Sequence, residues 1–253
     1  MDAALAAHLA TRSGPYAPLV GRFLLPASRY QEFSAAIPDA LIGEPIRLGL
    51  IADRGADHLR KSATSAEDPQ AVVELVECAA PSSQPDDVGA VAELLADVAT
   101  TQQVFIELPR SAAWADHLES NLRALADARL GGKFRTGGVV AEAFPSEAEV
   151  AAFIQAAVNT DVPFKLTAGL HNALRHTDPA TGFEHHGFLN VALAVADPDS
   201  AESLLAHRDP TTVAGLVRTI DASAVRSRWR AFGSCSIDEP VDDLVTLGLL
   251  ERL

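Results

Sequence analysis

The sequence contains little cysteine, and this limits the kind of protein that it can encode. Cys78 and Cys235 are the two cysteines among 253 residues, so the dense disulfide framework of a small secreted domain is excluded. The first residues carry no basic charge ahead of an apolar segment, which predicts a short surface helix in place of a secretion signal. A reduced, cytoplasmic setting is therefore expected.

Positive charge and long apolar runs are also scarce. The 34 Asp and Glu residues exceed the 20 Lys and Arg residues, which gives a formal net charge of -14. Nucleic acid and anionic membrane surfaces repel such an acidic chain. The longest apolar segment, residues 187–196, has about half of the ~20 residues that a membrane-crossing helix requires. We therefore expect a small-molecule substrate as partner, no nucleic acid and no membrane, and leave a homo-oligomer open.

The sequence instead shows a regular alternation of two patterns. Short runs rich in Val, Ile, Leu and Phe alternate with longer stretches of helical periodicity, which is typical of βα units in a parallel sheet. The runs begin roughly 25 to 30 residues apart, the length of one strand, one helix and two loops. They cover residues 20–25, 46–52, 72–78, 104–108, 133–136, 163–168 and 232–236, with an eighth strand expected near 211–217.

Eight such units in about 250 residues predict a (β/α)8 barrel of the TIM type. Because no Gly-rich linker divides the chain, we interpret residues 1–253 as a single domain with a short N-terminal helix. A doubly wound open parallel sheet is the alternative. That fold usually carries a G-x-G-x-x-G turn after its first strand, and none follows residues 20–25.

Charged residues interrupt several predicted strands, where a buried parallel strand should be apolar. Lys133 and Lys165 are the most informative, because only three of the 20 Lys and Arg residues are lysines. Arginine stays protonated, whereas a buried amine near other cations loses its charge more readily and can act as a base or Schiff-base nucleophile. In a barrel, Glu74 and Glu107 would be available nearby to move protons.

Alternation along the strands places Lys165 on the same face as Thr167 and Gly169, and Lys133 on the same face as Arg135. Such a group of cations beside carboxylates suits anion binding, general acid/base work or an iminium intermediate. The same side chains would equally suit a structural network of ion pairs, or would point outward between helices. The sequence leaves these alternatives open.

Four of the eight histidines fall within residues 171–186, directly after the sixth predicted strand. Imidazole is a common metal ligand and transfers protons near neutral pH. His171 or His186 is a candidate acid or base, and His171, His176 and His186 with Glu107 form an alternative site for a divalent metal. The spacing matches no specific zinc pattern, so no cofactor is expected, and loop packing would also explain these residues.

Small residues follow the fifth, sixth and last predicted strands. Gly137, Gly138 and Gly169 would let the backbone approach a ligand and offer N–H donors, and tight turns also account for them. Cys235 is either a nucleophile or a small residue that fills the barrel end. The expected catalytic residues are thus Glu107, Lys133, Lys165 and His171, and the expected substrate-binding residues are Glu74, Arg135, Gly137, Gly138, Thr167, Gly169, His186 and Cys235.

Residues 133–138, 164–171, 186–190 and 233–240 together resemble an uncharacterised bacterial family of hypothetical proteins from high-GC organisms. The resemblance covers the C-terminal half and implies no particular activity. Where this chain has Asn172, the family often has a second histidine, which argues against a metal site built on a histidine pair. The positions of Lys133 and Lys165 on neighbouring predicted strands are also similar to class I aldolase barrels, such as deoxyribose-phosphate aldolase and type I dehydroquinase. This second likeness implies an aldolase-like site.

Together these features predict a lyase or isomerase that acts on a small anionic carbonyl or carboxylate metabolite. Lys165 would be nucleophile or base, Lys133 and Arg135 would hold the negative charge of the substrate, and Glu107 with His171 would move protons. The alternatives are a metal-dependent hydrolase or isomerase, and a non-catalytic barrel that binds ligands or acts as a scaffold.

Overall fold

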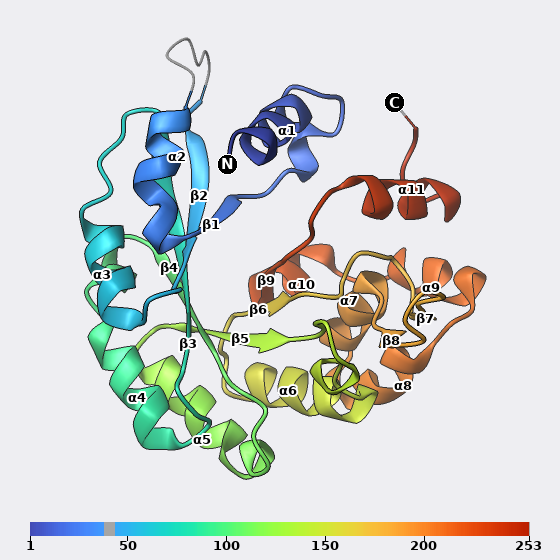
Figure 1. Cartoon of the computed structure of the whole chain (residues 1–253). Coiled ribbons are helices and arrows are strands. Elements are labelled where there is room, and N and C mark those ends of the chain that lie inside the picture. The colour runs from blue at the N-terminus through green and yellow to red at the C-terminus, as the bar shows by residue number, and fades with distance from the viewer. Residues whose placement is uncertain (38–43, 253) are drawn as a thin grey trace.

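The computed structural model describes residues 1–37 and 44–252 and contains one parallel sheet of seven strands (Figure 1). The strands lie in the order β1-β2-β3-β4-β5-β6-β9. They are β1 (Phe23–Pro26), β2 (Ile46–Ile51), β3 (Ala71–Ala79), β4 (Gln103–Glu107), β5 (Gly131–Arg135), β6 (Phe164–Thr167) and β9 (Trp229–Phe232). The sheet is curled into a half-barrel, with a convex side and a hollow side (Figure 1).

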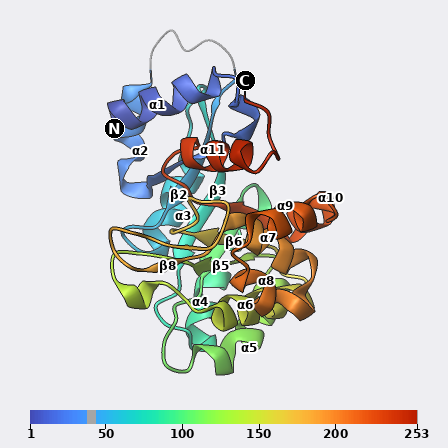
Figure 2. The same ribbon diagram turned by 90° about the vertical axis from the view of Figure 1, so that its right-hand side faces the viewer.

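Helices lie on both sides of the curled sheet. The convex side is covered by α3 (Ala56–Thr64), α4 (Pro85–Leu94), α5 (Trp114–Asp127) and α6 (Glu147–Asn159), while α2 (Tyr30–Ala36) lies beside β1 and β2. The predicted N-terminal helix is α1 (Asp2–Arg12). Figures 1 and 2 show α1 and the last helix, α11 (Asp238–Thr246), on the hollow side.

The predicted closed barrel of eight strands is wrong. Between β6 and β9 the chain forms a short hairpin, β7 (His176–Thr177) and β8 (Glu184–His185), and then four helices: α7 (Phe188–Ala196), α8 (Ala201–Ala206), α9 (Pro210–Val217) and α10 (Ala222–Arg228). Among the described residues β1 and β9 are therefore unpaired edges. The alternative expectation, an open parallel sheet with helices on both sides, is the one that the structure supports.

The strand expected near residues 211–217 is helix α9, and the reason is local. The Asp209 side chain accepts a hydrogen bond from the backbone N–H of Thr212, and Pro210 occupies the first helical turn. Both features are typical of a helix start. The last strand is also displaced from residues 232–236, because β9 ends at Phe232.

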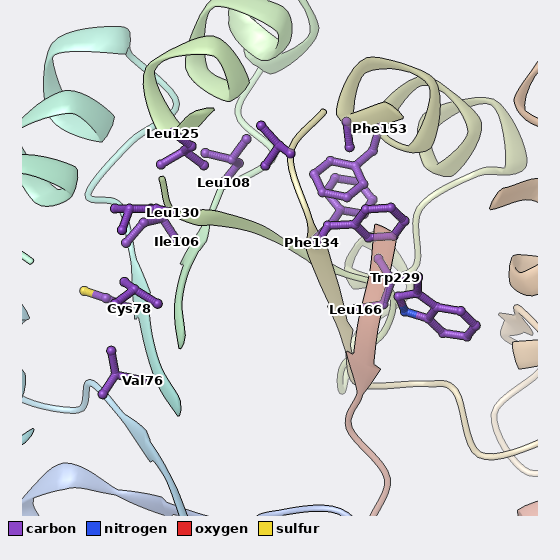
Figure 3. Close-up of a cluster of buried hydrophobic side chains, with 14 of the residues drawn as sticks. Val76, Cys78, Ile106, Leu108, Leu125, Leu130, Phe134, Phe153, Leu166 and Trp229 are labelled. Carbon is purple, nitrogen blue, oxygen red and sulfur yellow. The ribbon is translucent and has the colours of Figure 1, made fainter. Parts of the chain in front are cut away.

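The main hydrophobic core fills the space between the convex side of the sheet and its helices (Figure 3). The rings of Phe134 on β5 and Phe153 on α6 stack with centroids 4.7 Å apart. Gly132 lets α5 approach, since a Cβ atom there would lie 3.1 Å from Cδ2 of Leu122. Phe134 and Leu166 point into this core, so strand alternation turns their neighbours Lys133 and Lys165 toward the hollow side.

Candidate functional site

The structure brings the two strand lysines together. Lys133 on β5 and Lys165 on β6 are register partners in adjacent parallel strands. Both side chains are buried, with exposed fractions of 6% and 2%. Two ammonium groups side by side out of solvent repel each other and lose hydration, so they persist only with carboxylate partners.

Glu77 on β3 supplies the central carboxylate. Its Oε2 atom lies 2.6 Å from Nζ of Lys133, and its Oε1 atom accepts a hydrogen bond from Nζ of Lys165. The side chain is 1% exposed. Glu77 therefore links both lysines, although it was not among the residues predicted from the sequence.

Glu107, the last residue of β4, extends the network toward solvent. Its Oε2 atom lies 2.9 Å from Nζ of Lys133, and its Oε1 atom accepts a hydrogen bond of 3.0 Å from Nε of Arg135. The guanidinium of Arg135 is half exposed. The result is a chain of alternating charges that runs from Arg135 through Glu107, Lys133 and Glu77 to Lys165.

Burial and neighbouring charges give the two lysines different proton affinities. Burial lowers the pKa of Lys165; Glu77 opposes this shift, while the positive charges of Lys133 and Arg22 add to it. Burial also acts to lower the pKa of Lys133, but the carboxylates of Glu77 and Glu107 outweigh it and raise that pKa. Lys165 is thus the amine of the pair that more readily gives up its proton.

The pKa of Glu77 follows the same balance with the opposite sign. Burial acts to raise the pKa of this carboxyl, since the charged form is poorly solvated there. The ammonium groups of Lys133 and Lys165 outweigh burial and hold the pKa below its ordinary value. Glu77 is therefore ionised at neutral pH, between two cations.

The apolar ring of Phe105 lies beside the charged cluster on the hollow side. Glu77 pairs in register with Phe105, which in turn pairs with Gly131. A Cβ atom at Gly131 would lie 2.5 Å from Cδ1 of Phe105, so the ring occupies space that only glycine leaves open. Because Phe105 is itself buried, its ring excludes water from one side of the ion pairs, and the electrostatic attraction within each pair is stronger there.

A cavity of about 230 Å³ opens at the carboxyl ends of β4 and β5. Its walls include Glu107, Leu108, Arg135 and Ala143, together with Arg110, whose guanidinium binds the carboxylate of Glu149 at 2.7 Å. The carboxyl ends of parallel strands are where α/β proteins place their ligands. Glu107 and Arg135 are thus the cluster members that a small ligand would contact first.

The structure does not place Glu74 in the lysine cluster, in contrast to the prediction. Its carboxylate binds Nε of Arg22 at 2.8 Å and Nε of Arg47 at 3.0 Å. The register between β2 and β3 shifts at this point, since Leu48 pairs with Val73 and Gly49 with Leu75. Glu74 is the extra residue of this irregularity, so simple alternation does not hold across it.

The predicted glycines form a close contact between two loops rather than a ligand cradle. A Cβ atom at Gly137 would lie 2.9 Å from Cα of Gly169. At Gly169, where φ is +78°, a Cβ atom would lie 2.9 Å from the carbonyl oxygen of Thr136. Gly138 is exposed, and the carbonyl of Thr167 accepts a hydrogen bond of 2.8 Å from the backbone N–H of Thr136. These contacts support turn packing as the role of the glycines.

The predicted set of His171, His176 and His186 does not form a metal site, although His171 and His176 both lie near His185, whose pKa is lowered by burial and by their charges. The described residues contain no group of three or more His, Cys, Asp or Glu side chains placed to hold a metal ion. His186 is fully buried, with its Nε2 atom 2.7 Å from the carbonyl oxygen of Pro145; burial lowers its pKa, so the ring is neutral. His176 packs against His185 with ring centroids 5.1 Å apart. His171, His176 and His185 are all partly exposed, and Nδ1 of His171 lies 3.4 Å from Oγ of Ser234.

The two cysteines lie in different environments. Both are free thiols, with Cys78 buried and Cys235 exposed. Cys78 points into the convex core (Figure 3). Cys235 lies three residues beyond the end of β9, in the loop before α11, so it does not fill a barrel end as one interpretation had it.

Comparison with known proteins adds no assignment. No family model matches the sequence, and no curated protein matches it. The resemblance of the C-terminal segments to a bacterial family therefore stays a prediction. None of the described helices is long and apolar enough to cross a membrane.

Proposed function

We propose that this chain is an enzyme that moves protons on a small anionic carbonyl or carboxylate metabolite, in an isomerase or lyase reaction. The observation that carries the proposal is the position of Glu107. Its carboxylate lines the cavity at the carboxyl ends of β4 and β5 and is bound to Lys133 behind it. A carboxylate in this position can contact a bound substrate on one side while its ion pair with the buried Lys133 holds it in place on the other.

Arg135 supplies the anion-binding group. Its guanidinium lines the same cavity, is half exposed, and among the described residues carries one ion pair, to Glu107. A substrate carboxylate that binds this guanidinium would bring its adjacent carbon close to Glu107. The cavity, at about 230 Å³, is smaller than the roughly 300–1,000 Å³ typical of pockets for larger ligands, so the proposed substrate has few carbon atoms.

In the proposed step, Glu107 removes a proton from the carbon next to the carbonyl or carboxylate. The electron pair moves onto the carbonyl oxygen, and Arg135 stabilises the negative charge that develops there. In an isomerase whose substrate carries a hydroxyl on the deprotonated carbon, the proton returns from Glu107 to the former carbonyl carbon while the hydroxyl proton moves to the enolate oxygen, so the carbonyl changes position. In a lyase the electron pair returns from the oxygen and breaks the bond between the next carbon and its leaving group, which takes the proton from Glu107. Lys133 touches Glu107 and not the cavity, so it acts as a positioning residue that orients the carboxylate.

Proton exchange at carbon tests this proposal without knowledge of the product. Small 2-oxo and 2-hydroxy acids that raise the melting temperature would be incubated with the protein in D2O, and loss of the C–H signal followed by NMR. We expect exchange with the wild type, loss of exchange with Glu107→Gln while binding persists, and weaker binding with Arg135→Gln. No exchange for any acid that binds, or full exchange with Glu107→Gln, would refute the proposal.

A Schiff base at Lys165 is the second candidate, and the lowered pKa of that amine favours it. In this reaction the neutral amine adds to a substrate carbonyl, water leaves, and the resulting iminium withdraws electrons from the neighbouring carbon–carbon bond. Incubation with pyruvate or glyceraldehyde and borohydride would trap the adduct, and mass spectrometry would locate it. An adduct at Lys165 that Lys165→Arg abolishes would support this route, and its absence in the wild type would exclude it.

A further inference from the structure

A second cavity lies at the opposite end of the sheet from the candidate site. It measures about 160 Å³ and lies where α6 leads into β6 and where α10 leads into β9. Arg228, the last residue of α10, and Arg230, the second residue of β9, both line it. The indole of Trp229 between them stacks on Phe232 of the same strand, with ring centroids 5.3 Å apart.

Like some other arginines of the described chain, these two have no carboxylate partner, and Nη1 of Arg228 instead donates a hydrogen bond of 3.5 Å to the carbonyl oxygen of Val195. Arg110, Arg135 and Arg175 each have a carboxylate oxygen within 3.0 Å. Among residues 1–37 and 44–252, no carboxylate lies within the 4.0 Å ion-pair distance of Arg228 or Arg230. Their unmatched positive charge is notable in a chain of formal net charge -14, and it indicates an oxyanion as ligand.

The remaining walls specify what accompanies the oxyanion. Asp161 places a carboxylate on the cavity wall, which would accept a hydrogen bond from a hydroxyl or ammonium group and would repel a second negative charge. The hydroxyl of Ser227, also on the wall, donates its proton to the carbonyl of Ala224 at 2.7 Å, so toward a ligand it would act as a hydrogen-bond acceptor.

The apolar part of the cavity limits the size of the ligand. Ala157, Val158, Val162 and Pro163 form this part of the wall. They suit a body of a few carbon atoms and exclude a long polar chain.

We propose that this cavity is a binding site for a small molecule with one carboxylate that also carries a hydroxyl or ammonium group. Arg228 and Arg230 bind the carboxylate, and Asp161 accepts the hydrogen bond from the second group. The site lies at the amino ends of β6 and β9, whereas Glu107 and Arg135 lie at carboxyl ends. It is therefore separate from the proposed active site and does not depend on the function proposed there.

Three ligands of matched size test this assignment by isothermal titration calorimetry or NMR. Lactate and alanine carry the carboxylate with a hydroxyl or an ammonium group, and propionate carries the carboxylate alone. We expect saturable binding of lactate or alanine that is at least about tenfold tighter than binding of propionate. No saturable binding of lactate or alanine would overturn the proposal.

Variants locate the binding. The double variant Arg228→Gln with Arg230→Gln should weaken lactate or alanine binding at least about tenfold. Arg226→Gln is the matched control, because this exposed arginine of α10 does not line the cavity. Unchanged binding in the double variant, or an equal loss with Arg226→Gln, would overturn the proposal.

Asp161→Asn keeps the proposal testable if the arginine variants fold poorly. Asp161 has a φ of +53°, a left-handed conformation that asparagine tolerates well, so the backbone should not change. The variant should lose the preference for lactate or alanine over propionate, and an undiminished preference would refute the role of Asp161.

Discussion

Replacement of Glu77 by glutamine tests how much the central carboxylate of the buried charge cluster contributes to folding stability. Glu77 is the carboxylate that both lysines share. Lys133 would keep Glu107 at 2.9 Å, but among the described residues Lys165 has an ion pair with no other carboxylate. The variant therefore leaves one buried ammonium without a counter-charge, beside a second ammonium that repels it.

The expected decrease in the free energy of unfolding of Glu77→Gln can be estimated in two ways. Removing one partner of a buried ion pair typically costs about 3–5 kcal/mol, because the remaining charge is uncompensated. Lys165 can escape this cost by losing its proton, and for an amine of ordinary pKa 10.5 this costs about 5 kcal/mol at pH 7. The loss for Glu77→Gln should thus lie at about 3–5 kcal/mol, or roughly 6–20 °C in Tm for a protein of this size.

The stability loss of Glu77→Gln should become smaller as the pH rises. A loss caused by altered packing would not depend on pH in this way, so the pH dependence identifies the unpaired charge as the cause. In the variant the pKa of Lys165 falls further below its unfolded value, so the unfolded chain binds more protons and stability increases with pH. At pH 9, deprotonation of an amine with ordinary pKa 10.5 costs about 2 kcal/mol. Urea unfolding at pH 7 and pH 9, followed by circular dichroism, measures the difference.

Two further variants complete the experiment. In Glu77→Gln with Lys165→Met the unpaired charge is gone, so the double variant should recover most of the lost stability. Glu74→Gln is the matched control on the same strand, because its pairs with Arg22 and Arg47 are partly exposed and should contribute about 1 kcal/mol or less. The reasoning is refuted if Glu77→Gln costs no more than Glu74→Gln, or if the double variant is less stable than the single one.

The pairing of the two lysines was predictable because it depends on local alternation. In both β5 and β6 a lysine precedes an apolar residue that belongs to the core, Phe134 and Leu166. Adjacent parallel strands then bring the lysines to one face. The identity of the central carboxylate was harder to predict, because the register between β2 and β3 shifts beside Gly49. A glycine within a strand is a signal for such an irregularity, but it does not say which residue of the neighbouring strand is the extra one.

The wrong prediction of a closed barrel has a different cause. Spacing alone predicted an eighth strand, but Asp209 and Pro210 carry a helix-start signal that was present in the sequence. Whether the edges of a sheet then meet is decided by contacts between segments far apart in the chain, which periodicity does not report.

Two further predictions concern acid stability and the loop contact. Because the pKa of Glu77 is lowered in the folded state, the stabilisation that its charge provides is complete above the ordinary carboxyl value of 4.5 and is lost as the pH falls through the folded value. Just below pH 4.5, the free energy of urea unfolding should therefore fall more steeply with decreasing pH for the wild type than for Glu77→Gln. Equal pH dependence in the two proteins would contradict this. Gly169→Ala should cost about 1–3 kcal/mol, because φ is +78° and the new Cβ would lie 2.9 Å from the carbonyl oxygen of Thr136. Gly182→Ala, with φ +74° and no atom within 4 Å, carries the backbone strain alone, so it should cost about 1 kcal/mol. Equal losses in the two alanine variants, measured by thermal unfolding, would show that the contact between the loops after β5 and β6 contributes nothing.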